Sequence, residues 1–456
     1  MKSIEELYLS ESYTFEVVYK TDKTAFAGRL ELSPNELKLT IRGDEYQDRK
    51  IELYEPFIGQ LVCHGYHEIF ILNDLVLQKS SSRVITEDYL LWFQEVIYTA
   101  GSVIHCHKVF DDDLPFGYVK LFSKSVGQWL GLTTTQARIL ESFDTQSPSI
   151  FEDSPYEFSH ALGEYESIGA KYNISFEGGY ETFTSGLSFS PTLDYHLNLV
   201  SAREVVTAFH KTFNFLAFVL GHDPVIDRVE LYSPGCIKAS LYVATGSAKP
   251  ERRERYVMLP SGLNVKPEFN YANLPPIPSV FFSRYFGQDS ELSSIVEKYI
   301  KYRSMTNIEE QFLGFFRLLE KQCFKPKDYL DAESLKEVVL NAKELLRSKG
   351  LNRNEIKSFE GALKKANGSK YNTEKCISDF YNSLPRVVGD SLDVGEGLIA
   401  KICKLRNDIS HANHYVLSDT DLYTYTSMVE KLLTLSLLER LGLDLGEFEQ
   451  IAKRLD

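Results

Sequence analysis

Apolar and polar residues alternate through much of the first half of the chain, with the two-residue period of half-buried strands. The segment AGRLELSPNELKLTIRG predicts a β-hairpin around a Ser-Pro-Asn turn, with its apolar face made by Leu30, Leu32, Leu37, Leu39 and Ile41. The segment HEIFILNDLVLQKS repeats this design and predicts a second hairpin around Asn73-Asp74. Further alternating segments follow, so we expect a β-rich, sandwich-like N-terminal region.

One helix is expected within this region, over SAREVVTAFHKTFNFLAFVLG, where Ser201 can cap the start and Gly221 can end it. Three prolines in four residues then predict an extended connector at NYANLPPIPSVFFS, residues 270–283. We place the domain boundary just after it. The expected domains are 1–285, with a division into two subdomains near 125–150, and 286–456.

Beyond the connector the apolar residues recur with the period of helices. On NIEEQFLGFFRLLEKQC they are Ile308, Phe312, Phe315, Leu319 and Cys323. Further helices are expected at about 333–348, 353–366, 373–383, 394–412 and 419–441. The fold class predicted is therefore α+β with several domains: a β-rich N-terminal region with a helix, followed by an all-α helical bundle.

Composition and charge exclude several classes of protein. Hydrophobic residues make up 43% and charged residues 25% of the 456 residues, which is ordinary for a folded protein. There is no signal-peptide pattern and no run of about 18 apolar residues, so we expect a cytoplasmic protein with no membrane partner. The six cysteines are scattered, which favours reduced thiols over a disulfide framework.

The net charge of −14 argues against nonspecific coating of nucleic acid, but it is unevenly distributed. Residues 1–285 carry a net charge of −12 and residues 286–456 one of −2. Residues 343–375 hold nine Lys/Arg against four Asp/Glu and form the most basic long segment. Any binding of RNA is therefore expected in the C-terminal domain.

The segment RNDISHAN, residues 406–413, carries the strongest candidate chemistry. On a helical wheel Leu398, Ile402, Leu405 and Ile409 form one apolar stripe that faces the bundle core. The polar residues roughly opposite this stripe are Lys404, Asn407, His411 and His414, with Arg406 on its flank. A cationic face with an imidazole is thus expected to point away from the core of its own domain.

Histidine, arginine and asparagine could together cut RNA without a metal. Attack by the ribose 2′-hydroxyl needs a group to take its proton, and we assign His411 as the acid or base of the reaction. The pentavalent phosphorane needs a cation, for which we assign Arg406, and Asn407 would orient the phosphate. The spacing alone is weak, because Arg203 and His210 match it too, although Glu204 beside Arg203 would repel phosphate. The structural alternative is that the segment is only a helix C-terminus, where cations complement the helix dipole and Asn413 is the stop residue.

The sequence LRNDISHAN followed by YVLSDTDLYTYTSMVEKLLTLSLLERLGL resembles the end of a HEPN domain. The arrangement of a strand-rich region before a helical domain is similar to the Apea-like HEPN proteins of bacteria. The resemblance implies a metal-independent endoribonuclease, acting in abortive anti-phage defence, with a composite site between two copies of the chain. It also implies that the N-terminal region is a sensing module, with a phage protein as the candidate trigger.

The resemblance further implies host RNA as the substrate, with tRNA as a candidate, and a symmetric homodimer or higher oligomer. We assign RNA contacts to the cationic residues of the C-terminal domain, which are Lys404, His414, Lys349, Arg353, Lys364 and Lys365, with Tyr371 for stacking on a base. No cofactor is expected. The alternative function is a non-catalytic nucleotide- or protein-binding module that dimerises through its helices.

A second group of residues has the chemistry of metal ligands. CHGYH and HCH place Cys63, His64, His67, His105 and His107 in two short segments. His105 and His107 share one face of a predicted strand. The paired-cysteine spacing of a zinc ribbon is absent, so ordinary histidines of a sheet are the default expectation, and whether these residues bind a metal stays open.

Overall fold

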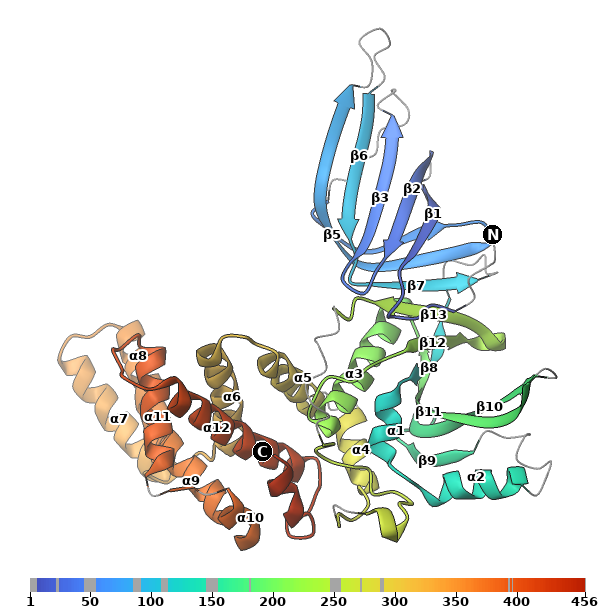
Figure 1. Cartoon of the computed structure of the whole chain (residues 1–456). Coiled ribbons are helices and arrows are strands. Elements are labelled where there is room, and N and C mark those ends of the chain that lie inside the picture. The colour runs from blue at the N-terminus through green and yellow to red at the C-terminus, as the bar shows by residue number, and fades with distance from the viewer. Residues whose placement is uncertain are drawn as a thin grey trace. The chain divides into compact units, whose positions relative to one another are not determined.

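The computed structural model describes the chain except for residues 1–5, 22–23, 45–54, 85–91, 108–113, 145–154, 180–181, 247–255, 271–272, 288–290, 393, 396 and 456. The chain divides into two compact units, Met1–Ser293 and Ser294–Asp456 (Figure 1). The first unit holds all thirteen strands of the described residues, and the second holds helices. The expected β-rich N-terminal region and helical C-terminal region are therefore confirmed.

The strands of the first unit are β1 (Tyr13–Lys20), β2 (Ala25–Leu32), β3 (Leu37–Asp44), β4 (Phe57–His64), β5 (Glu68–Val84), β6 (Trp92–Thr99), β7 (Ser102–His107), β8 (Phe116–Phe122), β9 (Tyr156–Ala161), β10 (Ser167–Gly179), β11 (Thr182–Val200), β12 (Arg228–Ser233) and β13 (Ile237–Val243). The predicted hairpin is formed by β2 and β3, which pair Leu32 with Leu37 and Leu30 with Leu39. All of its predicted apolar side chains are buried.

The strands follow one hydrogen-bonded order, β4-β1-β2-β3-β6-β5-β7-β13-β12-β8-β11-β10-β9, and β4 also pairs with β5. This additional pairing closes the first six strands into a ring, so they form a small barrel at one end of the order (Figure 1). The strands thus form one continuous ladder and not the two separate sheets of a sandwich. Alternation along a strand shows which face is buried, but it does not show which strands pair.

Strand β5 connects the barrel to the other strands. Its residues 68–73 pair with β7, and its residues 76–84 pair with β6. The hairpin turn expected at Asn73-Asp74 is wrong, because the strand continues through it. Asp74 has a φ of 52°, a conformation that aspartate tolerates better than most residues, and it turns the backbone without ending the strand. Asn73 is buried, and its Nδ2 donates to Ser102 Oγ on β7 at 3.2 Å.

Helices α1 (Lys124–Leu130), α2 (Thr134–Asp144), α3 (Ala202–Leu220) and α4 (Ser279–Phe286) complete the first unit, with 3-10 turns η2 (Pro234–Cys236) and η3 (Pro267–Phe269). The predicted ends of α3 are confirmed, since Ser201 and Glu204 form a capping box and Gly221 ends the helix with a φ of 77°. The subdomain division expected near 125–150 falls on α1 and α2, and its last residues, 145–150, lie outside the described residues.

The connector expected over 270–283 is helical at its end, because α4 begins at Ser279 directly after Pro278. Phe282 on α4 packs against Phe158 of β9 and Phe215 of α3, with ring centroids 5.2 and 5.6 Å apart. Trp129 on α1 joins this buried aromatic core. The expected boundary after residue 285 therefore falls inside the last turn of α4, whose rings belong to the core of the first unit.

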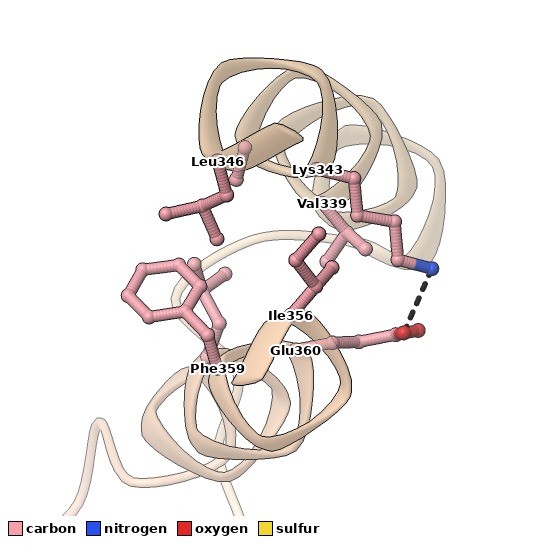
Figure 2. A pocket seen from close by; sticks show the side chains of 8 residues that line it. Val339, Lys343, Leu346, Ile356, Phe359 and Glu360 are labelled. Carbon is pink, nitrogen blue, oxygen red and sulfur yellow. Dashed lines mark ion pairs between the residues drawn. The ribbon is translucent and has the colours of Figure 1, made fainter. Parts of the chain in front are cut away.

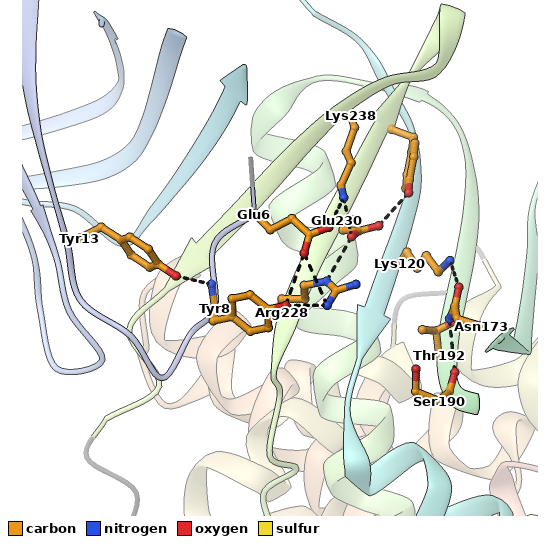
Figure 3. Close-up of polar contacts among 11 residues, drawn as sticks. Glu6, Tyr8, Tyr13, Lys120, Asn173, Ser190, Thr192, Arg228, Glu230 and Lys238 are labelled. Carbon is orange, nitrogen blue, oxygen red and sulfur yellow. Dashed lines mark hydrogen bonds and ion pairs between the residues drawn. The ribbon is translucent and has the colours of Figure 1, made fainter. Parts of the chain in front are cut away.

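The N-terminal segment is held to the first unit by a network of charges (Figure 3). Glu230 on β12 is buried and lies 3.2 Å from Arg228 Nε and 2.8 Å from Lys238 Nζ. Glu6 pairs with the same two cations, at 3.7 and 2.8 Å, and Tyr8 forms an isolated bridge with Arg228. Two cations thus compensate the buried carboxylate, and the segment before β1 is bound to β12 and β13.

The second unit contains α5 (Glu291–Arg303), whose first residues precede the division between the units, then α6 (Ile308–Cys323), α7 (Ala332–Ser348), α8 (Arg353–Asn367), α9 (Thr373–Ser383), α10 (Arg386–Ser391), α11 (Leu398–Ser410), α12 (Asp419–Arg440) and the 3-10 turn η4 (Glu449–Arg454). Helices α5 and α10 were not predicted. The second half of α12 is buried on all sides and packs along α6, so these two helices form the centre of the bundle.

Candidate active site

The segment 406–413 forms the last turn and the C-terminal cap of α11. The helix ends at Ser410, and His411 is its capping residue. The N–H of Ala412 donates to the carbonyl of Ile409, and the N–H of Asn413 donates to that of Asp408. This pair of bonds is a Schellman motif, in which Ala412 occupies the left-handed position with a φ of 52°. The stop residue is therefore Ala412 and not Asn413.

The left-handed conformation at Ala412 predicts a stabilising substitution. An alanine with positive φ is strained relative to glycine, so Ala412→Gly should raise the free energy of unfolding by about 0.5 to 1 kcal/mol. Urea unfolding measures the change. Ala400→Gly, inside α11, is the matched control and should lower stability by about 1 kcal/mol. A destabilised Ala412→Gly variant would show that the cap is not formed as described.

The expected orientation of α11 is found in its last turns. Ile402 and Leu405 are buried, whereas Lys404, Asn407 and His411 are exposed. The imidazole of His411 is thus accessible from outside its own bundle, as catalysis requires. The helical wheel does not apply to His414, because it lies beyond the end of the helix, although its side chain is exposed too.

Arg406 is held in place by contacts from two helices. Its guanidinium Nη2 lies 3.0 Å from Glu320 Oε2 on α6, and its Nη1 donates to Asn407 Oδ1 at 2.9 Å. The guanidinium also covers the ring of Phe316, with its Cζ 5.6 Å from the ring centroid. Thr373 Oγ1 on α9 donates to Glu320 Oε1 at 2.6 Å, which orients the carboxylate. Arg406 therefore has one defined position, with its side chain 30% exposed.

The sequence did not identify Glu320 or Thr373 as parts of this site. The only sequence feature of Glu320 was its position next to Leu319, at the edge of the predicted apolar stripe of α6. Its contact with Arg406 joins residues 86 positions apart, and a helical period contains no information about such pairs. Cys403, one turn before Arg406, is buried, which raises the pKa of its thiol to about 12. It is therefore neutral near pH 7 and is no candidate nucleophile.

The four basic residues assigned to RNA on α7 and α8 are all exposed, but they do not form one patch. Lys349 and Arg353 lie at the tip of the α7–α8 hairpin. Lys364 and Lys365 lie near the other end of α8, a helix of 15 residues and thus about 22 Å long. The basic segment 343–375 is continuous in sequence, but the α7–α8 hairpin separates these four cations into two groups.

Ion pairs of Glu360 neutralise part of this hairpin, and Figure 2 shows the pair with Lys343. Glu360 lies 2.7 Å from Lys343 and 2.8 Å from Lys364. The two lysines lower the pKa of Glu360 to about 2, so the carboxylate is ionised at neutral pH and offsets their charge. The apolar side chains between the helices, such as Val339 and Ile356, leave no space for a sphere the size of water. The hollow between the helices is thus a packing seam and not a ligand pocket.

The ring of Tyr371, which follows α8, has two cations close to it. Lys327 Nζ and Lys375 Nζ are 5.8 and 5.9 Å from its ring centroid. Tyr371 comes two residues before Thr373, which bonds to the partner of Arg406. Proteins that bind single-stranded RNA combine aromatic rings, which stack on bases, with cations, which contact the phosphate backbone. Lys327 was not among the predicted residues.

Of the five candidate metal ligands in the first unit, the structure brings His105 and His107 together with Glu68, which the sequence did not indicate. The second match to the arginine-histidine spacing, Arg203 and His210, lies on α3, where Arg203 is 3.7 Å from Asp74.

Two family models match the chain. Residues 12–271 match the model described as ApeA N-terminal domain 1, and residues 318–447 match the model described as Apea-like HEPN. The first match covers more than half of the chain, and the second includes Glu320, Thr373 and the whole of α11. No curated protein and no solved structure matches the chain. Within the described residues, no helix combines the length and the apolar character needed to cross a bilayer.

Proposed function

The chain belongs to the ApeA family of HEPN-domain anti-phage effectors, and from this premise we propose that it is a metal-independent endoribonuclease that uses Arg406, Asn407 and His411. One observation carries the proposal. Contacts from two helices fix the guanidinium of Arg406, and the exposed imidazole of His411 lies about one turn later, at the capped end of α11. Preorganised charge of this kind is what stabilises a developing phosphorane.

The roles follow from the chemistry of RNA transesterification. A base removes the proton of the 2′-hydroxyl, whose oxygen attacks the phosphorus, and an acid protonates the leaving 5′-oxygen. His411 serves as one of these groups, because imidazole exchanges protons near neutral pH. Arg406 stabilises the added negative charge on the phosphate, and the amide of Asn407 orients a phosphate oxygen. The products are a 2′,3′-cyclic phosphate and a 5′-hydroxyl.

The reaction needs both a base and an acid, and the motif supplies one imidazole per chain. Two copies related by a two-fold axis would bring two His411 side chains to one cleft. The exposure of Asn407 and His411 supports this arrangement, because neither side chain is used in the core of its own bundle. We propose that the active form is such a symmetric dimer, and that the first unit senses infection, with a phage protein as the trigger.

The position of Glu320 suggests that it positions Arg406 and does not itself contact RNA. Glu320→Gln removes the charge but keeps an oxygen that can accept from the guanidinium. We expect kcat to fall about tenfold, because Arg406 loses its fixed position. KM for RNA should change less than kcat, because the loss of a negative charge near the phosphate offsets the looser placement of the guanidinium. Steady-state cleavage kinetics separate the two parameters.

Glu310→Gln, an exposed carboxylate on the same helix, is the matched control and should leave both parameters unchanged. A Glu320→Gln variant with the wild-type kcat would show that the ion pair serves the fold alone.

The proposal is tested by incubating the purified chain with total RNA in EDTA and determining the ends of the products. Cleavage that gives a 2′,3′-cyclic phosphate, and that stops when the cleaved nucleotide is 2′-deoxy, is expected. Sequencing of 5′ ends during infection would then identify the RNA, for which host tRNA is our candidate. Binding of RNA without cleavage would favour the alternative, a non-catalytic module that binds nucleotides or proteins.

A further inference from the structure

Three side chains in the first unit form a cluster with the composition of a transition-metal site. Alternation along β7 places His105 and His107 on one face, and Glu68 of β5 is paired with His107 in the register. Glu68 Oε1 lies 3.7 Å from His105 Nε2 and 3.7 Å from His107 Nδ1. One ligand atom from each residue lies within 4.8 Å of the other two. Cys63, His64 and His67 are not members of this group.

The imidazoles of this cluster are buried without hydrogen bonds. Both ring nitrogens of His105 and both of His107 are inaccessible to solvent and have no hydrogen-bond partner among the described residues. The side chain of His105 is 1% exposed. Buried polar atoms are nearly always paired in native proteins, because leaving one unpaired costs about 1 to 3 kcal/mol. These unpaired nitrogens beside one carboxylate therefore call for a partner that the described part of the chain does not supply.

A protonated histidine paired with Glu68 does not resolve this. The shared oxygen at 3.7 Å is beyond hydrogen-bond distance from either ring, and one carboxylate charge cannot balance two imidazolium ions. A divalent cation pairs with one nitrogen of each ring, because it accepts a lone pair from each neutral imidazole and from the carboxylate at once.

The distances suit a tetrahedral ion after small side-chain movements. Zinc bonds of about 2.0 to 2.2 Å place tetrahedral ligand atoms about 3.3 to 3.6 Å apart. Each carboxylate-imidazole separation of 3.7 Å is therefore close to the final distance. Phe70 stacks on His105 at 4.9 Å and Phe15 lies 5.6 Å from it, so aromatic rings pack around this imidazole and fix its position. A Cβ added to Gly65 would lie 3.1 Å from Glu68 Oε2, so glycine leaves room for this carboxylate.

We propose that Glu68, His105 and His107 bind one zinc ion that links β5 to β7. Two histidines and one carboxylate are a zinc ligand set with three protein donors, which leaves one coordination position for a water molecule. The zinc site shares no residue with the proposed ribonuclease site, and neither proposal depends on the other.

The test uses the full-length chain, stripped with a chelator and then titrated with zinc sulfate alone. Bound zinc is counted by mass spectrometry after gel filtration, and thermal unfolding is followed by circular dichroism. We expect one zinc ion per chain and a rise in Tm of about 5 °C or more at saturation. Magnesium sulfate should produce neither effect, because Mg²⁺ prefers oxygen ligands.

Glu68→Gln and His107→Gln keep the size of the side chains and remove one ligand each. Both variants should have the spectrum and Tm of the stripped wild type, and zinc should no longer raise Tm. His64→Gln and His67→Gln, which alter histidines outside the cluster, should bind zinc as the wild type does.

Cobalt(II) provides a second measurement, which reports on the ligands and not on the stability of Glu68→Gln and His107→Gln. Its visible d–d bands in the wild type should be lost in His107→Gln. Zinc uptake by Glu68→Gln and His107→Gln equal to that of the wild type, or no uptake by the wild type, would overturn the site.

Discussion

Replacing His411 by alanine will abolish cleavage of RNA and leave the fold unchanged. The proposed reaction needs proton transfer at two oxygens, and positioned acid-base groups contribute about 10² to 10⁴ in rate. His411 is exposed at the C-cap of α11, where its backbone N–H bonds to the carbonyl of Asn407, and alanine preserves that bond. The measurement is the single-turnover rate in EDTA, together with the growth of cells that express each variant during infection.

His414→Ala is the matched control, because His414 is an exposed histidine three residues further along. It should retain cleavage, with at most a moderate increase in KM, since its proposed role is contact with the RNA backbone. A His411→Ala variant that cuts RNA at the wild-type rate, or that remains toxic, would remove His411 from the site. Equal losses for both variants would mean that the two histidines act together.

Arg406→Lys will lower the rate of cleavage by about 10² to 10³ although the positive charge remains. The guanidinium bonds to Glu320 and Asn407 from two different nitrogens, and it lies over Phe316. A lysine ammonium cannot reproduce this fork, so the charge would no longer be held where the phosphorane forms. Stability should fall by less than about 1 kcal/mol, because both partners of the ion pair are about 30% exposed and solvent screens them.

Measuring kcat beside urea unfolding separates these two effects. Lys401→Ala, which removes an exposed charge from the same helix, is the control and should change the rate less than threefold. An Arg406→Lys variant with more than half of the wild-type rate would show that a point charge suffices and that the guanidinium group is not required.

Features set by local chemistry were predictable from the sequence. The hairpin from Leu30 to Ile41, the capping box of α3 and the outward face of α11 each depend on residues within a few positions of one another. Two local predictions were wrong, because the backbone conformation of a single residue cannot be read from hydrophobic periodicity or composition. Asp74 continues a strand with positive φ, and Ala412, not Asn413, takes the left-handed cap.

Features set by distant contacts were not predictable. The pairing of β5 with three other strands, which joins the barrel to the remaining sheet, depends on tertiary packing. Glu320 meets Arg406 across 86 positions of sequence, and Glu68 meets His105 only because β5 pairs with β7. The basic segment 343–375 is continuous in sequence, but the hairpin places its cations at opposite ends and Glu360 offsets two of them.

The central claim is that two copies of the chain build one ribonuclease site. The most direct test mixes wild-type chain with the His411→Ala variant at equal amounts and constant total concentration, after exchange of subunits. If each site needs His411 from both copies, only wild-type pairs cut RNA, and the rate should fall to about a quarter. A rate that falls only to one half, in proportion to the wild-type fraction, would mean that each chain acts alone and would contradict the composite site.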